Sequence, residues 1–134
     1  MRPKLSLMLC SLVLGSGVAM ASPHDDLTAA VARTHDDGVR VAYHAAETII
    51  AERDLESAQI DMNTFRARWD AAIRADNSDE AAHWAVAHLR AQDAAKDAYN
   101  RVVAERAERD IARADFRRDA AEAQRAKKLA RTRG

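Results

Sequence analysis

The stretch "RADNSDEAA", residues 74–82, decides the fold because it is the one clear interruption in an otherwise helix-forming chain. Its Asp-Asn-Ser triplet at 76–78 consists of residues that favour turns and helix N-caps. The Asp-Glu pair that follows stands where acidic side chains stabilise the first turn of a helix. The sequence therefore predicts one helix over 24–76, a short turn at 76–79 and a second helix over 79–131.

The composition on both sides of this turn is strongly helical. From residue 24 to residue 133 the chain has no proline and a single glycine, Gly38, and 29 of the 113 residues from Ser22 onward are alanine. Alanine, arginine and glutamate are among the best helix formers, and no segment of strand length alternates apolar and polar residues. Ser22 and Pro23 suit the N-cap and the first helical position. We expect an all-α fold, with Gly38 bending or restarting the first helix.

The first predicted helix carries a heptad pattern. Two rows of residues recur every seven positions and together form a mostly apolar seam from Val41 onward, which is typical of a coiled coil. The first row is Leu27, Thr34, Val41, Thr48, Leu55, Met62 and Trp69, and the second is Ala30, Asp37, His44, Ala51, Ala58, Phe65 and Ala72.

The second predicted helix is less regular. One seam is formed by Ala81, Trp84, His88, Ala91, Ala95, Ala98 and Val102. It breaks at Glu105 and Arg109, while apolar residues resume out of phase from Val103 to Ala114 and from Ala112 to Ala123. Such a phase shift indicates a stutter or a change of packing partner.

The charge distribution favours an antiparallel hairpin. Residues 22–76 carry 11 acidic and 6 basic side chains, whereas residues 101–134 carry 6 acidic and 11 basic ones. A short turn makes the helices antiparallel neighbours, so that residue i faces roughly residue 155 − i. The acidic start then meets the basic end. The pairs expected to meet are Asp36 and Asp37 with Arg117 and Arg118, and Asp25 and Asp26 with the stretch containing Lys127, Lys128 and Arg131.

Two alanine-rich helices bury little apolar surface, and burial supplies roughly 25 cal/mol per Å². A lone hairpin of this composition would be marginally stable. We therefore expect self-association, with two hairpins forming a four-helix bundle, or docking onto a larger partner.

Residues 1–21 resemble a secretory signal peptide. Arg2 and Lys4 precede the uncharged segment 5–18, and Ala19-Met20-Ala21 forms a small-x-small cleavage site. The apolar segment is shorter than the ~20 residues of a membrane-spanning helix, which favours cleavage over retention as an anchor. Cys10 is the only cysteine, so no disulfide is expected after cleavage. The domain is then residues 22–134, and we expect it in the periplasm or secreted.

The triplet His24-Asp25-Asp26 returns as His35-Asp36-Asp37, which raises the possibility of a metal site. Eleven residues are about three helical turns, so the two histidines share a face but lie ~16 Å apart, too far to share one ion. We favour helix-start and ion-pairing roles for the carboxylates. Ligand spacing of i,i+3 occurs at His44–Glu47 and Glu80–His83. The alternative is a divalent transition-metal site formed by His24, His35, His44, Glu47, Glu80 and His83.

Trp69 and Trp84 would lie almost opposite each other, with Phe65 and His88 close by. This aromatic cluster near the turn is interpreted first as core packing and alternatively as a partner-binding tip, since aromatic residues dominate interface hot spots. His44 and His88 fall on the seams, where histidine sets register or makes assembly pH-dependent.

The basic segment Arg117–Arg133 is interpreted as a solvated, ion-paired end, with contact to an anionic surface as the alternative. It contains no aromatic residue to stack on bases, and the whole chain balances 21 basic against 21 acidic residues, so no nucleic-acid partner is expected.

The sequence contains no Gly-rich phosphate loop, nucleophile elbow or haem-attachment motif. We therefore hypothesise a non-enzymatic, exported coiled-coil interaction protein: a scaffold, adaptor or holdase-like binder that associates with itself or with another exported protein and needs no cofactor. The alternative hypothesis is a periplasmic divalent-metal-binding or metal-sensing helical protein.

Overall fold

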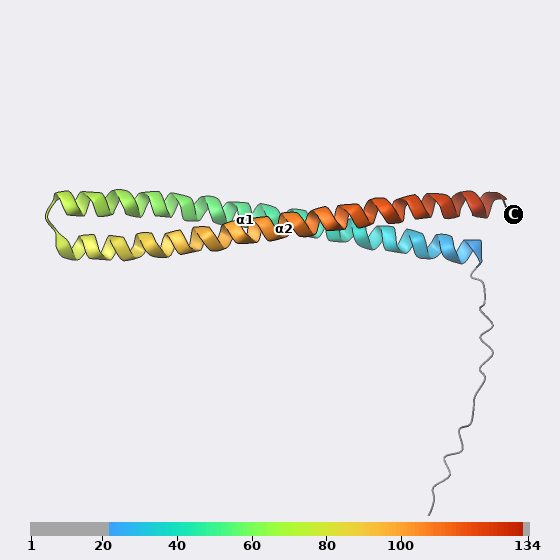
Figure 1. Ribbon diagram of the computed structural model, residues 1–134, viewed down its shortest axis with the longest axis horizontal. Helices are drawn as coiled ribbons and strands as arrows, with labels where there is room; N and C mark the ends of the chain where they lie inside the picture. Colours follow the sequence, from blue (N-terminus) through green and yellow to red (C-terminus); the bar gives the residue numbers. More distant parts are fainter. Residues whose placement is uncertain (1–21, 133–134) are drawn as a thin grey trace, which may run out of the picture.

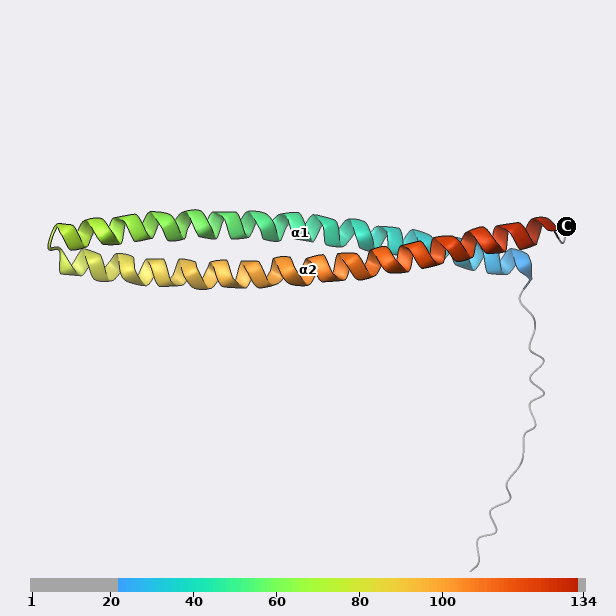
Figure 2. The same ribbon diagram turned by 45° about the horizontal axis from the view of Figure 1, so that its top comes forward.

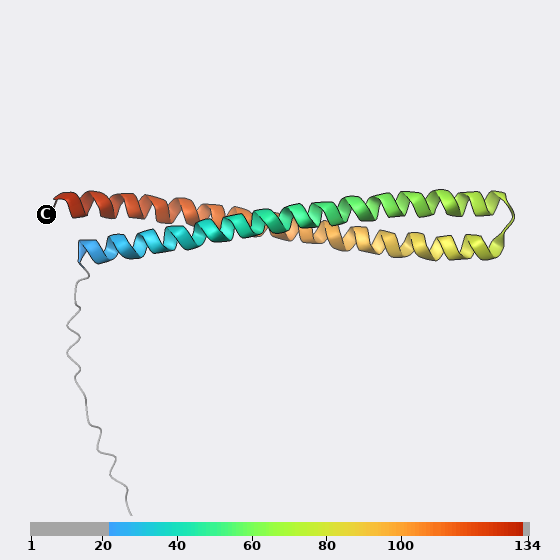
Figure 3. The ribbon, with the colours of Figure 1, turned by 180° about the vertical axis from the view of Figure 1, so that it is seen from behind.

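The computed structural model describes residues 22–132, which form two helices, α1 (Pro23–Arg74) and α2 (Ser78–Thr132), of 52 and 55 residues. At ~1.5 Å per residue each helix is about 80 Å long. The helices lie side by side in opposite directions, with the start of α1 and the end of α2 at the same end of the molecule (Figure 1). They also cross: α2 passes in front of α1 near the middle of Figure 1, and α1 passes in front when the molecule is seen from behind (Figure 3). The predicted all-α antiparallel hairpin is confirmed.

The turn combines a C-terminal cap of α1 with an N-terminal cap of α2. Asp76 adopts the left-handed conformation, with φ 54°. Its N–H donates to the Ile73 carbonyl (3.1 Å) and the Asn77 N–H donates to the Ala72 carbonyl (3.0 Å), which is the Schellman pattern. Asn77 then caps α2, because its side-chain oxygen accepts from the Glu80 N–H at 3.2 Å. Helix α1 therefore ends two residues before the predicted position and α2 begins one residue earlier. The turn closes the end of the hairpin opposite the C-terminus (Figure 2).

The start of α1 is fixed by a capping box. The Ser22 hydroxyl accepts from the Asp25 N–H at 3.1 Å, and the Asp25 carboxylate accepts from the hydroxyl and the N–H of Ser22. Hydrogen bonding by the Ser22 side chain, followed by that of its backbone, lowers the pKa of the Asp25 carboxyl below its ordinary value.

The predicted signal peptide lies outside the described residues. Neither α1 nor α2 contains an apolar stretch long enough to cross a membrane.

The predicted heptad seam of α1 is the contact face. All fourteen residues of its two rows are buried or half-buried. The buried apolar side chains of the hairpin are nevertheless small. They are Ala30, Ala51, Ala58 and Ala72 from α1, and Ala91, Ala98, Val102 and Ala112 from α2. Within residues 22–132 no large side chain is fully buried, so the two backbones pack closely along an alanine seam.

Two sequence predictions about helix continuity are wrong. The seam of α2 shows no phase shift, because Glu105 and Arg109 are half-buried on it while Val103 and Ile111 remain about half exposed. Polar residues thus continue the seam, and the apolar row faces outward. Gly38 does not restart α1, which is continuous from Pro23 to Arg74. A Cβ added at Gly38 would lie 3.5 Å from the nearest carbon of the Phe116 ring, which is an ordinary van der Waals contact.

Residues that face each other across the hairpin have numbers that add to roughly 155, as predicted. The predicted ion pairs, however, do not form. Asp37 pairs with Arg40 within α1. Arg118 pairs with Asp115 and Asp119 within α2, and its hydrogen bond to Asp119 raises the pKa of its guanidinium. Within the described residues no ion pair joins Asp25 or Asp26 to the stretch 127–131. The pairs that do cross the hairpin are Arg33–Asp119, Arg33–Glu122, Arg40–Asp115, Glu52–Arg106 and Asp54–Arg101.

Asp76→Gly should stabilise the hairpin. An L-residue with positive φ is strained, whereas glycine adopts this conformation freely, so we expect the free energy of unfolding to rise by about 0.5–1 kcal/mol. Ala75→Gly is the control, because Ala75 has φ −84° and gains nothing from glycine. Thermal unfolding at a fixed protein concentration measures both. A variant at Asp76 no more stable than the wild type would contradict the role given to this residue.

Ser22→Ala should return the pKa of Asp25 toward the ordinary value of an aspartate, since it removes the hydroxyl that donates to the carboxylate. In the wild type the depressed pKa means that the capping box is fully present above the ordinary pKa of about 3.9 and is lost as the pH falls through the lower, folded value. Carboxyl titration by NMR measures the shift. Identical Asp25 titrations in the two proteins would show that the box does not form.

Candidate interaction surface

Many large aliphatic and aromatic side chains lie outside the seam. Within residues 22–132, fourteen large apolar side chains are exposed, with exposed fractions from 39% to 58%. They are Val31, Val39, Tyr43, Ile49, Ile50, Ile60, Ile73, Val86, Leu89, Tyr99, Val103, Ile111, Phe116 and Leu129. The most buried apolar positions of the hairpin are thus mostly alanines, while many larger apolar side chains remain exposed.

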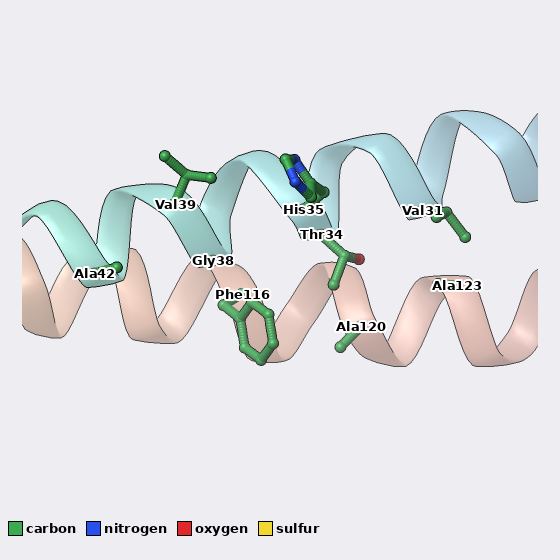
Figure 4. Close-up of a pocket in the computed structure, with 9 residues that line it drawn as sticks. All are labelled: Val31, Thr34, His35, Gly38, Val39, Ala42, Phe116, Ala120 and Ala123. Atoms are coloured by element: carbon green, nitrogen blue, oxygen red, sulfur yellow. The ribbon is translucent and has the colours of Figure 1, made fainter.

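A groove runs between the helices near the open end of the hairpin (Figure 4). Its volume is about 600 Å³, and it is lined almost entirely by apolar atoms. The Phe116 ring lies beside Gly38 on its floor, while Val31 and Val39 project from α1 along its edge. The remaining lining residues are Thr34, His35, Ala42, Ala120 and Ala123. No lining side chain carries a permanent charge.

The two flanks of the seam differ in this half of the molecule. Arg33, Arg40 and Asp54 stand in one row with a period of seven, and each forms an ion pair with α2. Val31 and Gly38 belong to a row on the opposite flank, where the groove opens. One flank therefore carries ion pairs from Arg33 to Asp54. The other is apolar at the groove, with charged side chains beyond it at Glu52, which pairs with Arg106, and at Arg113 and Arg117 of α2.

The aromatic cluster near the turn forms, with a different pairing from the one predicted. Phe65 stacks on Trp84 with ring centroids 5.7 Å apart, and Trp69 lies against His88 at 6.0 Å. All four rings are half-buried. The guanidinium of Arg68 covers Trp84 at 4.6 Å. These contacts account for the cluster as packing within the hairpin, and its role in binding a partner stays a prediction.

A polar pair in the middle of the seam was not predicted. His44 Nδ1 lies 2.8 Å from Glu105 Oε2, and both side chains are largely buried, with exposed fractions of 18% and 26%. The sequence showed Glu105 only as a break in the apolar row. The relation 155 − i places His44 opposite residue 111, six residues from Glu105, so it did not identify this pair. Asp37 Oδ2 and Arg109 Nε are buried without a hydrogen-bond partner in the protein.

The candidate metal ligands are not brought together. His44 contacts Glu105 rather than Glu47, and Glu80 accepts from Asn77 and from the Trp84 indole N–H. His35 contacts Asp36 at 3.5 Å. His83 lies edge-on to Trp84, and His24 stands at the open end, in the first turn of α1. Along 22–132 no group of three or more histidine, cysteine or acidic side chains could hold a metal ion.

The basic side chains of the last turns of α2 are exposed, namely Arg125, Lys127, Lys128 and Arg131. Contact of this end with an anionic surface stays a prediction.

Comparison of the chain with protein-family models, with curated proteins and with solved structures finds no match.

The single changes His44→Leu and Glu105→Leu should each destabilise the hairpin by about 1–3 kcal/mol, because each leaves one largely buried polar group without its partner. The double change should be much less harmful than the sum of the two, since two leucines can pack together in the seam. Denaturant unfolding of the four proteins gives the coupling free energy, for which we expect at least about 1 kcal/mol. Strictly additive effects would show that the two side chains do not interact.

Proposed function

We propose that this protein is a non-enzymatic interaction protein: a self-associating helical hairpin that acts as a scaffold, adaptor or holdase-like binder outside the cytoplasm. The observation that carries the proposal is the exposure of fourteen large apolar side chains around a seam of alanines. The proposed location follows from the sequence of residues 1–21 and is an expectation from that segment alone.

Energetics support association. Full burial of a valine, leucine or isoleucine side chain contributes about 1.5–3 kcal/mol, and half-exposed side chains retain a large part of that for an interface. Helices of this length depend mainly on packing of an apolar face for their stability. The alanine seam buries little apolar surface and therefore contributes little stability. A partner that covers the outer aliphatic side chains would bury more apolar surface and stabilise the hairpin.

The arrangement of polar groups supports binding rather than catalysis. The titratable side chains nearest the seam pair with one another, as His44 does with Glu105 and Arg33 with Asp119. The groove beside Phe116 is a concave surface lined by apolar atoms. An apolar groove without charged groups favours docking of another apolar surface.

The test is light scattering coupled to size exclusion on residues 22–134, with and without a chelator. We expect a defined oligomer, with a mass at least twice that of one chain, that the chelator leaves unchanged. A monomer at micromolar concentration would overturn the proposal. An oligomer that falls apart in the chelator would instead favour the metal-binding alternative and make His24, His35, His44 and His83 the first residues to replace.

A further inference from the structure

The outward face of α1 is almost free of charge over half its length. Residues 27–50 contain five charged side chains, whereas residues 51–74 contain nine. Among the five, Asp37 is buried in the seam, and Arg33, Arg40 and Glu47 stand in the single row on the ion-paired flank. Asp36 alone faces outward. A helix that is apolar on nearly all sides is normally covered by protein.

This face contains a second heptad seam, distinct from the one that packs on α2. Its members are spaced alternately four and three residues apart: Val31, His35, Gly38, Ala42, Ala45 and Ile49. Glu52 and Glu56, next in the same spacing, end it. The two seams lie about 100° apart around the helix, as expected for a helix with two neighbours in a four-helix bundle.

The second seam is complementary to itself. If a second α1 runs antiparallel with the two-fold axis level with Arg40, residues whose numbers add to 80 lie opposite one another. Val31 then meets Ile49, His35 meets Ala45, and Gly38 meets Ala42. Small residues stand at the centre, where the backbones approach, and large ones at both ends. This reciprocity, in which residue i contacts j and j contacts i, is the requirement of a two-fold interface.

The charge pattern beyond this seam fits the same register. His24 and Glu56 also add to 80, so an imidazole would lie beside a carboxylate at each end of the interface. The ion-paired flank of α1, with Arg33 and Arg40, turns away from it. In this arrangement no like charges of the second seam oppose each other.

The face is large enough for a specific dimer. From His24 to Glu56 the helix is about 48 Å long, and at about 10 Å across it offers on the order of 500 Å² on each chain. The two faces together reach about 1,000 Å², the lower limit for a specific interface. The groove residues of α2, above all Phe116 with an exposed fraction of 39%, add to this.

We infer that two copies of this chain dimerise by packing α1 against α1 in antiparallel orientation through the seam from Val31 to Ile49, with the Gly38–Phe116 groove at the edge of the interface. This inference rests on the proposed self-association and specifies the surface, partner and register.

The test uses single cysteines, because the chain from Ser22 onward contains none. Val39 flanks the seam within one residue of the level of the axis and is exposed in the hairpin, so the Val39→Cys residues of two chains should be joined by a short bis-thiol cross-linker. Ala114→Cys is the matched control, since Ala114 lies at the same level on the outer face of α2. We expect cross-linking at position 39 to exceed that at position 114 by at least tenfold.

A second pair of variants tests the same surface without cross-linking. Ala42→Arg places a charge at the centre of the interface and should convert the dimer to monomer in light scattering, whereas Ala114→Arg should leave it intact. Both alanines are exposed, so neither change disturbs the seam of the hairpin. Where dissociation also unfolds the Ala42→Arg protein, the cross-linking result decides.

The outcomes separate the two proposals. Cross-linking at 39 and not at 114, with loss of the dimer in Ala42→Arg, supports the inferred interface. A wild-type oligomer that cross-links equally at 114, or that survives Ala42→Arg, overturns this interface and leaves self-association standing. A wild-type monomer overturns both.

Discussion

The close approach of two helices along an alanine seam is the constraint on which the rest of the hairpin depends. Ala51 and Ala112 are completely buried, and within residues 22–132 no large side chain is. Of the apolar side chains buried within residues 22–132, seven are alanine and one, Val102, is larger, whereas Ile49, Ile60 and Val103 lie outside the seam. The same constraint that makes the hairpin narrow therefore gives it an apolar exterior.

Polar contacts set the register of this seam more than its stability. Exposed ion pairs such as Asp54–Arg101 contribute about 0–1 kcal/mol each. A seam of similar small residues could slide by one heptad at little cost in packing. The largely buried His44–Glu105 pair and the Arg33–Asp119 contact would lose their partners in a shifted register, which penalises the alternatives.

The fold was predictable because period and turn chemistry are local properties. The rows through Leu27 and Ala30, and the turn at 76–78, identified the helices and their facing residues. The partners within the seam were less predictable. Glu105 was interpreted as a break in the apolar seam of α2, because periodicity counts apolar residues and cannot show that a histidine faces a glutamate. The expected pairs of Asp36 and Asp37 with arginines of α2 failed because Arg118 has two carboxylates nearer to it within its own helix.

The turn also has a kinetic consequence. Because residue i meets roughly residue 155 − i, contacts beside the turn join positions close in the chain, whereas those at the open end join positions about a hundred residues apart. Loop closure is least costly near Asn77, so the hairpin can zip from the aromatic cluster of Phe65 and Trp84 toward Ser22. The apolar groove at Gly38 is then among the last parts of the hairpin to form. Its formation is therefore coupled to the binding of the surface that covers it.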